Sequence, residues 1–258
     1  MLMIVNTKTL PRRSPQVSLA YGYRRVEISN WAKRLVSTPA LLLGFLAVTA
    51  MAIGPFQWID DRMNVRWIKT YAPSLEWFMQ NVLDRIAGQA VCLPILALVA
   101  LILAYRRRTW RPIIIATLAE LAFYGGVGGL KVIFARPSPT VFDPAFFHGG
   151  IFDMGSHGIS YPSGHAAEAV LIYGTAAFLI IAYGNISKRL AHGLWWAVAV
   201  ITVNTVVVSF LLGWHWISDL VGGVIAGGLF LRLLVLIHDR LYLYHLDNRR
   251  TEQITLRI

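Results

Sequence analysis

Six apolar segments alternate with polar stretches between residues 39 and 237 of the 258-residue chain. They cover residues 39–53, 87–105, 112–134, 166–183, 194–212 and 217–237. Each has roughly 15 to 23 residues, near the length that a helix needs to cross the hydrocarbon core of a bilayer. The pattern therefore predicts an all-α fold, an integral membrane bundle of six transmembrane helices.

Two of the polar stretches between these segments are long. Residues 56–85 contain Trp58, Trp67 and Trp77 among charged residues, a combination typical of the membrane–water interface. We therefore expect an interfacial helix between the first and second spans. Residues 136–164 are rich in Pro, Gly, His and Asp and too polar to face lipid, so we expect an irregular loop there.

The composition supports a membrane protein and argues against a nucleic-acid partner. Hydrophobic residues make up 56% of the chain and charged residues 14%, proportions unlike those of a soluble domain. The net charge of +11 comes from basic residues between the apolar segments and at the chain ends, without the aromatic interleaving of a strand-binding groove. The single cysteine, Cys92, cannot form an intrachain disulfide, and we expect it to be a small buried hydrophobe.

The basic residues also predict the topology. Most of them lie in four places: residues 1–36, 106–111, 188–189 and 239–258. With six spans, all four fall on one side of the membrane, which the positive-inside rule makes cytoplasmic. We expect a cytoplasmic tail over residues 1–36, a membrane domain over 37–238 and a second cytoplasmic tail over 239–258. The protein is then a multi-pass protein of the plasma membrane, the inner membrane of a bacterium, with no removable signal peptide and no second domain.

Three polar stretches then meet at the exoplasmic face: residues 131–139, 161–165 and 209–219. His215 and Asp219 are four residues apart, so on a helix they share a face, and the carboxylate can orient the imidazole and stabilise its cation. Lys131 can attract a phosphate as a point charge. The turn that leads to His165 can offer backbone N–H donors to an anion. Together these groups indicate phosphate chemistry.

The spacing of these residues resembles the three signatures of the type-2 phosphatidic acid phosphatase family of membrane phosphatases. Those signatures are a Lys followed after six residues by Arg-Pro, then Pro-Ser-Gly-His, then Ser-Arg, five residues, His, three residues and Asp. The chain matches them at Lys131, at residues 162–165, at His215 and at Asp219. The resemblance runs from about the third apolar segment to the sixth, and the layout of six segments agrees with it.

The resemblance fails at both arginines of the signatures. Ser138 and Ser209 occupy those positions, and Arg136 lies two residues before the first of them. Three explanations are open. Arg136 and other groups compensate, or the substrate needs less anion binding because it is a diester or is held by its lipid part, or the protein has lost hydrolysis.

The resemblance implies a mechanism and a set of site residues. His215 attacks phosphorus and forms a phosphohistidine, Asp219 orients His215, and His165 protonates the leaving oxygen. Lys131 and the Gly164 amide neutralise the developing charge. The substrate-binding residues that we predict are Lys131, Arg136, Ser138, Ser163, Gly164 and Ser209. Catalysis needs no cofactor or metal, and the acids and histidines of the 136–164 loop, His148, His157, Asp143 and Asp153, match no tight ligand spacing.

Two further acids lie in the apolar segments. Glu120 is near the middle of the third and must be paired with another helix or line a cavity. Glu168 follows His165 by one helical turn and can bond its ring or pair with Lys131.

We therefore expect a lipid phosphatase or phosphotransferase that acts on a lipid phosphate or pyrophosphate ester at the exoplasmic face. The partners implied are the bilayer and a membrane lipid phosphate, such as a polyprenyl, glycerolipid or lipid A type ester. The alternative is a non-hydrolytic protein that binds or transports an anionic lipid with a degenerate phosphatase site. Nothing in the sequence indicates an oligomeric state.

Overall fold

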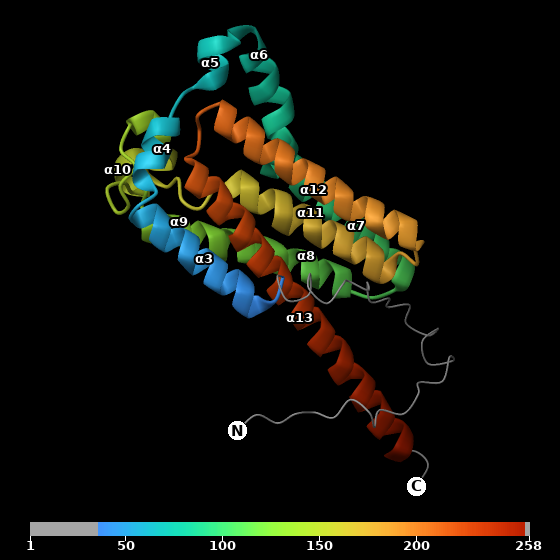
Figure 1. Ribbon diagram of the computed structural model, residues 1–258. Coiled ribbons are helices and arrows are strands. Elements are labelled where there is room, and N and C mark those ends of the chain that lie inside the picture. Colours follow the sequence, from blue (N-terminus) through green and yellow to red (C-terminus); the bar gives the residue numbers. More distant parts are fainter. Residues whose placement is uncertain (1–35, 256–258) are drawn as a thin grey trace, which may run out of the picture.

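The computed structural model describes residues 36–255, with side chains up to residue 240, and every regular element in that range is helical (Figure 1). In chain order these are α3 (Thr38–Ile53), α4 (Gln57–Met63), α5 (Trp67–Tyr71), α6 (Pro73–Phe78), the π-helix η2 (Met79–Leu83), the 3-10 turn η3 (Asp84–Ala87), α7 (Gln89–Arg107), α8 (Arg111–Leu121), the π-helix η4 (Ala122–Val127), α9 (Gly128–Phe134), the 3-10 turn η5 (Pro139–Val141), α10 (Ile151–Met154), the 3-10 turn η6 (Gly155–Gly158), α11 (Gly164–Tyr183), α12 (Lys188–Leu211) and α13 (Ile217–Thr255).

Within the described part of the chain, five helical segments are long and apolar enough to cross a membrane. They are Pro73–Arg107, Arg111–Val141, Gly164–Tyr183, Lys188–Leu211 and Ile217–Arg240. The first apolar segment forms α3, and the chain bends by 72° between α3 and the α4–α5 stretch; this bent pair makes a sixth span if it counts as one. The predicted all-α membrane bundle is confirmed.

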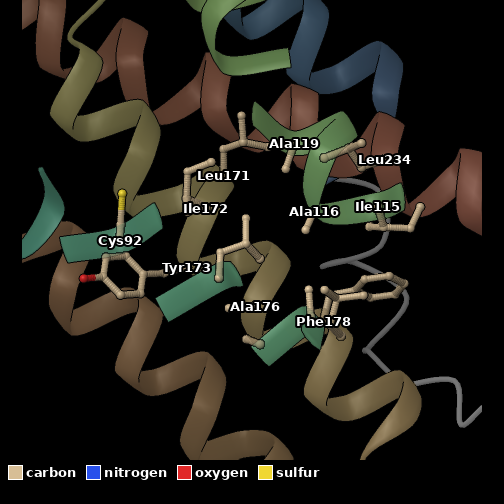
Figure 2. Close-up of a cluster of buried hydrophobic side chains, with 14 of the residues drawn as sticks. Cys92, Ile115, Ala116, Ala119, Leu171, Ile172, Tyr173, Ala176, Phe178 and Leu234 are labelled. Atoms are coloured by element: carbon tan, nitrogen blue, oxygen red, sulfur yellow. The ribbon is translucent and has the colours of Figure 1, made fainter. Parts of the chain in front are cut away.

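Helix α11 is the centre of the bundle. In its most apolar 18-residue window 78% of the residues are buried, against 22% to 33% in the other four segments. It packs against α13, α7, α12 and α8. Side chains from α7, α8, α11 and α13 form the main core, which includes the buried thiol of Cys92 (Figure 2). The His165 end of α11 is therefore fixed by the rest of the bundle.

The predicted interfacial stretch contains three short helices, α4, α5 and α6, where one helix was expected, and α6 already begins the apolar segment Pro73–Arg107. The chain leaves helical geometry at Asn64 and at Ala72, and Pro73 then begins α6. Trp58 and Trp77 are 60% and 69% exposed, as anchors at a membrane surface would be. The π-helix η2 and the turn η3 join α6 directly to α7, so residue 84 lies deeper in the bundle than a loop residue would.

Glycines let α13 approach α11 and the 161–165 turn. A Cβ on Gly222 would lie 2.7 Å from the Tyr161 ring, and one on Gly223 would lie 2.5 Å from the carbonyl oxygen of Ser163. Neither distance is possible for a real Cβ. These glycines therefore bring Asp219, at the start of α13, and His215, in the turn just before it, against the turn that carries His165.

The last helix is longer than the predicted apolar segment 217–237. Helix α13 continues to Thr255, well past residue 237, so most of the predicted 239–258 tail extends the last helix away from the bundle (Figure 1). Residues 1–35 lie outside the described residues, and the expected N-terminal tail with them.

Candidate active site

Arg136 is turned inward by the residue before it. Ala135 has a φ of 39°, a left-handed conformation that ends α9 and reverses the chain. The Arg136 side chain is 0% exposed. The irregular loop over residues 135–163 therefore begins inside the bundle and not at its surface.

The Arg136 guanidinium is committed to protein partners. It donates to Asp219 Oδ1 at 2.6 Å, to Asp60 Oδ2 at 2.7 Å and to Ser218 Oγ at 2.8 Å, and its Nε donates to the carbonyl oxygen of Pro144 at 2.9 Å. The aromatic rings of Phe146 and Trp216 also contact the guanidinium, with their centroids 4.6 and 5.4 Å from its carbon atom. Binding a phosphate would require breaking a buried ion pair, so this geometry argues against our prediction that Arg136 holds the substrate.

His215 lies in the turn between α12 and α13, and its Nδ1 faces two oxygens. Ser160 Oγ is 3.1 Å away and Asp219 Oδ2 is 3.4 Å away. Ser160 donates its own proton to Asp219 Oδ2 at 2.5 Å, so its lone pair is the one that accepts Nδ1–H of His215. The backbone N–H of Trp216 also donates to Asp219. This arrangement keeps the proton on Nδ1 and leaves the lone pair of Nε2 for chemistry.

Burial sets the protonation state of His215. Its side chain is 13% exposed, and this burial lowers its pKa below the ordinary value of 6.5, although the hydrogen bond to the Asp219 carboxylate acts in the opposite direction. The imidazole is therefore neutral near pH 7, as a nucleophile requires.

His165 is the second residue of α11, whose N-cap is Ser163. Its Nε2 lies 3.4 Å from Asp84 Oδ2, and Asp84 is 3% exposed. Ser209 Oγ donates to Asp84 Oδ1 at 3.2 Å. The acid that contacts the His165 ring is thus Asp84, from η3, and not Glu168.

Lys131 lies beside the first residue of α11. Its Nζ donates to the carbonyl oxygens of Ile159 and Ser160 at 2.9 and 3.3 Å, and a Cβ on Gly164 would be 3.4 Å from its Cε. An ammonium has three donors, which leaves one for a substrate oxygen. Gly164 begins the helix, so its N–H has no partner within α11. Lys131 and Gly164 thus have donors free for an anion, and their role in substrate binding stays a prediction.

Three predicted substrate-binding serines have other roles in the structure. Ser163 is fully buried, donates its N–H to the Asp219 carbonyl at 2.9 Å and accepts from Ala166 as the N-cap of α11. Ser138 is buried and pairs with Thr140 and with His157. Ser209 holds Asp84. The bonds of these serines are made within the protein, so the geometry does not support direct substrate contacts for them.

Lys131, His165, His215 and Asp219 lie close together in the structure. Three residues that the sequence did not single out join them. His215 interacts electrostatically with Lys131, His165 and Asp219. The three missed residues are Asp60, Asp84 and Ser160. Ser160 stands two residues before Pro162 and only that proximity could have suggested it. The two aspartates lie in the interfacial stretch, where charged residues are usually solvated.

The remaining polar residues of the described part of the chain are paired with one another or spread apart. Among the described residues no group of three or more His, Cys, Asp or Glu side chains is placed to hold a metal ion. Asp143 pairs with His148 at 2.9 Å on the surface of the loop. Glu120 accepts a hydrogen bond from Gln89 of α7 at 3.3 Å, the interhelical contact that its position required.

Comparison with known proteins assigns the chain to a family. The family model of the PAP2 superfamily matches residues 109–243, more than half of the chain. The chain belongs to the PAP2 superfamily. The matched region contains Lys131, His165, His215 and Asp219, whereas Asp60 and Asp84 precede it.

A solved PAP2 structure has a similar fold. The crystal structure of a transmembrane PAP2 type phosphatidylglycerolphosphate phosphatase from Bacillus subtilis superposes with a TM-score of 0.65 over 79% of this chain and 96% of that chain, at 20% sequence identity. No curated protein sequence matches the chain. The PAP2 fold and a membrane phosphatase of this general kind are thus supported, and the finer assignment depends on the site.

Proposed function

We propose that this PAP2 protein is a lipid phosphatase or phosphotransferase that works through a phosphohistidine on His215. The observation that carries the proposal is the arrangement of His215, Ser160 and Asp219, which holds Nδ1–H and leaves Nε2 unprotonated. A second histidine, His165, stands at the same site. A nucleophile and a proton donor are the two groups that such a displacement needs.

The reaction has two displacements. In the first, His215 Nε2 forms a bond to phosphorus while the bond from phosphorus to the ester oxygen breaks, and His165 gives its proton to that oxygen. In the second, water or an acceptor alcohol attacks phosphorus, its proton passes to His165, and the N–P bond breaks. Lys131 and the Gly164 N–H stabilise the charge on the oxygens of phosphorus during both steps.

The buried ion cluster behind His215 supports its change of charge. Asp60 and Asp219 carry two negative charges and Arg136 one positive charge, so the cluster has a net charge of −1 next to the ring. That charge stabilises the cation formed when His215 bonds to phosphorus. Arg136 thus serves the nucleophile by holding Asp219 in place.

The site is proposed to face the exoplasm, with both termini in the cytoplasm of a plasma membrane. Asp84, His165 and Asp219 lie at the beginnings of η3–α7, α11 and α13. The basic residues 106–111 and 188–189 lie at the other ends of α7 and α11. This separation and the positive-inside rule support the assignment.

The second candidate is a non-hydrolytic protein that binds or transports an anionic lipid. The observation that favours it is the site's loss of both signature arginines, because Ser138 and Ser209 bond within the protein and Arg136 is enclosed by carboxylates. The neutral, oriented His215 favours the enzyme.

The test is turnover of a panel of lipid phosphates in detergent micelles by the full-length protein. The panel contains phosphatidic acid, a polyprenyl diphosphate, a lipid A type phosphate and phosphatidylglycerol phosphate, the last because the Bacillus subtilis relative is a phosphatase for it. We expect turnover of at least one substrate, its loss in His215→Ala, and unchanged turnover in His148→Ala, which removes an exposed histidine. Turnover that survives His215→Ala refutes the proposal.

A further inference from the structure

Asp84 is a buried carboxylate in the active site that the family signatures do not include. It lies in η3, before the region that the PAP2 family model matches, and is 3% exposed. Its Oδ2 is 3.4 Å from His165 Nε2, and its Oδ1 accepts the Ser209 hydroxyl at 3.2 Å. A carboxylate this deep needs a partner, and the two groups that contact it are both at the site.

Ser209 holds the Asp84 carboxylate that contacts His165. The sequence resemblance places a phosphate-binding arginine at position 209, on α12. The chain has instead a fully buried serine whose hydroxyl fixes a carboxylate. The serine brings no positive charge to this position, and the carboxylate that it holds lies beside His165.

The titratable groups around Asp84 are His165 and Glu168 on α11 and His215 in the turn before α13. Ser209 on α12 is a neutral hydrogen-bond donor to it. The neighbouring Arg85 is exposed and donates to Asn81 within its own segment at 3.1 Å. Lys131 is the cation that stands beside Gly164, with two of its three donors already used.

The contact with Asp84 also gives the two ring nitrogens of His165 different roles. Asp84 faces Nε2, so in the protonated ring Nε2–H points at the carboxylate and Nδ1–H is the proton available to a leaving oxygen. His215 has the mirror arrangement, with its carboxylate at Nδ1 and Nε2 reactive. Each histidine is thus held by an acid through the nitrogen that does not react.

We propose that Asp84, fixed by Ser209, is the positioning residue of His165 and that the site therefore takes lipid phosphodiesters, which carry one negative charge, in preference to dianionic phosphate monoesters. This inference rests on the proposed function. In the step it describes, the bond from His215 Nε2 to phosphorus forms, the bond from phosphorus to one ester oxygen breaks, and Nδ1–H of His165 passes to that oxygen. Water or an acceptor alcohol then attacks phosphorus and returns a proton to His165.

The size of the expected effects follows from charge and proton transfer. A general acid contributes about a hundredfold to ten-thousandfold to a rate, and loss of its positioning partner should remove about tenfold to a hundredfold of that. Asp84 repels the second negative charge of a monoester, which should lower kcat/KM by about three- to thirtyfold relative to a diester.

The experiment compares three probes with the full-length protein in detergent micelles. Phosphatidylglycerol is a diester with an alcohol leaving group, phosphatidic acid is a monoester with the same acyl chains, and bis(4-nitrophenyl) phosphate is a diester whose leaving group needs no proton. The wild type should prefer phosphatidylglycerol to phosphatidic acid. Asp84→Asn should lower kcat for phosphatidylglycerol about tenfold to a hundredfold, change kcat for the nitrophenyl ester by less than about threefold, and reduce the preference for the diester.

Two further variants guard against a purely structural effect. Ser209→Ala keeps the charge of Asp84 and should produce the same pattern at smaller size, while Asp61→Asn removes an exposed aspartate and should change nothing. A wild-type preference for phosphatidic acid, turnover of none of the probes, or an equal loss on both diesters in Asp84→Asn overturns the inference. If turnover of any lipid in the panel described under Proposed function still depends on His215 in those cases, the proposed function stands; turnover independent of His215 refutes the proposed function itself.

Discussion

The guanidinium of Arg136 lies between the carboxylates of Asp60 and Asp219, at 2.7 and 2.6 Å, with no solvent access. Asp60 also accepts from the backbone N–H and the hydroxyl of Ser218. The interfacial helix α4, the irregular loop and the start of α13 are joined at this one point. The junction places Asp219 and, through it, His215.

Removal of Arg136 should therefore destabilise the protein strongly. Arg136→Gln leaves two buried carboxylates without their cation, a change that costs about 3 to 5 kcal/mol. Denaturant unfolding in detergent measures the change, with Arg62→Gln, at an exposed position on α4, as the control. A loss below about 1 kcal/mol in Arg136→Gln would show that the junction does not hold the fold together.

Ser160 should contribute to catalysis more than to stability. Ser160→Ala removes the hydroxyl between His215 and Asp219, so Nδ1–H loses its nearer acceptor and the ring its fixed tautomer. We expect kcat on the preferred lipid phosphate to fall about tenfold to a hundredfold, with a stability loss near 1 kcal/mol. Ser156→Ala, on the exposed part of the same loop, should leave both unchanged. Equal kcat values for the two variants would contradict the role of Ser160.

The pH dependence of kcat/KM should reflect the burial of His215. Attack on phosphorus needs the neutral ring, and burial lowers the pKa of His215 below 6.5, so the neutral form persists as the pH falls past 6.5. Activity is then retained at pH 6.5 and is lost only as the pH falls through the lower pKa. Steady-state kinetics on one substrate across this range check the sign, and an acid limb centred above pH 6.5 would contradict it.

Two glycines provide a matched test of the close packing that assembles the site. Gly223→Ala places a methyl group 2.5 Å from the Ser163 carbonyl oxygen, so we expect a loss of about 1 to 3 kcal/mol and reduced activity as α13 moves from the turn. Gly129→Ala meets nothing within 4 Å and should be neutral or slightly stabilising, since alanine favours helix. Thermal unfolding and turnover of both variants decide the point, and similar stabilities would argue against tight packing at Gly223.

The sequence predicted the parts of this protein that depend on local pattern. Apolar length gave the spans, and the spacing of four residues between His215 and Asp219 gave their contact. The contacts that complete the site join residues far apart in the chain: Arg136 bonds Asp60 across 76 positions, and Ser209 bonds Asp84 across 125. No periodicity encodes such pairs, so the sequence could not show that Arg136 is enclosed or that Ser209 holds an acid.

The division of the interfacial stretch has the same origin. Tryptophans beside charges identify a membrane surface but not the helix boundaries, which here follow from Pro73 and from Asp60 being drawn into the bundle by Arg136. The segment that looked like an anchor at the membrane surface supplies two of the buried acids of the site, Asp60 and Asp84.

Trapping of the phosphohistidine on His215 tests the proposed mechanism most directly. Wild-type protein is mixed with a lipid substrate labelled at phosphorus, quenched within one turnover, and digested to locate the label. We expect an acid-labile, base-stable label on His215 that is absent in His215→Ala and present in His148→Ala. A label that persists in His215→Ala, or turnover of the same substrate without any label on His215, would contradict it.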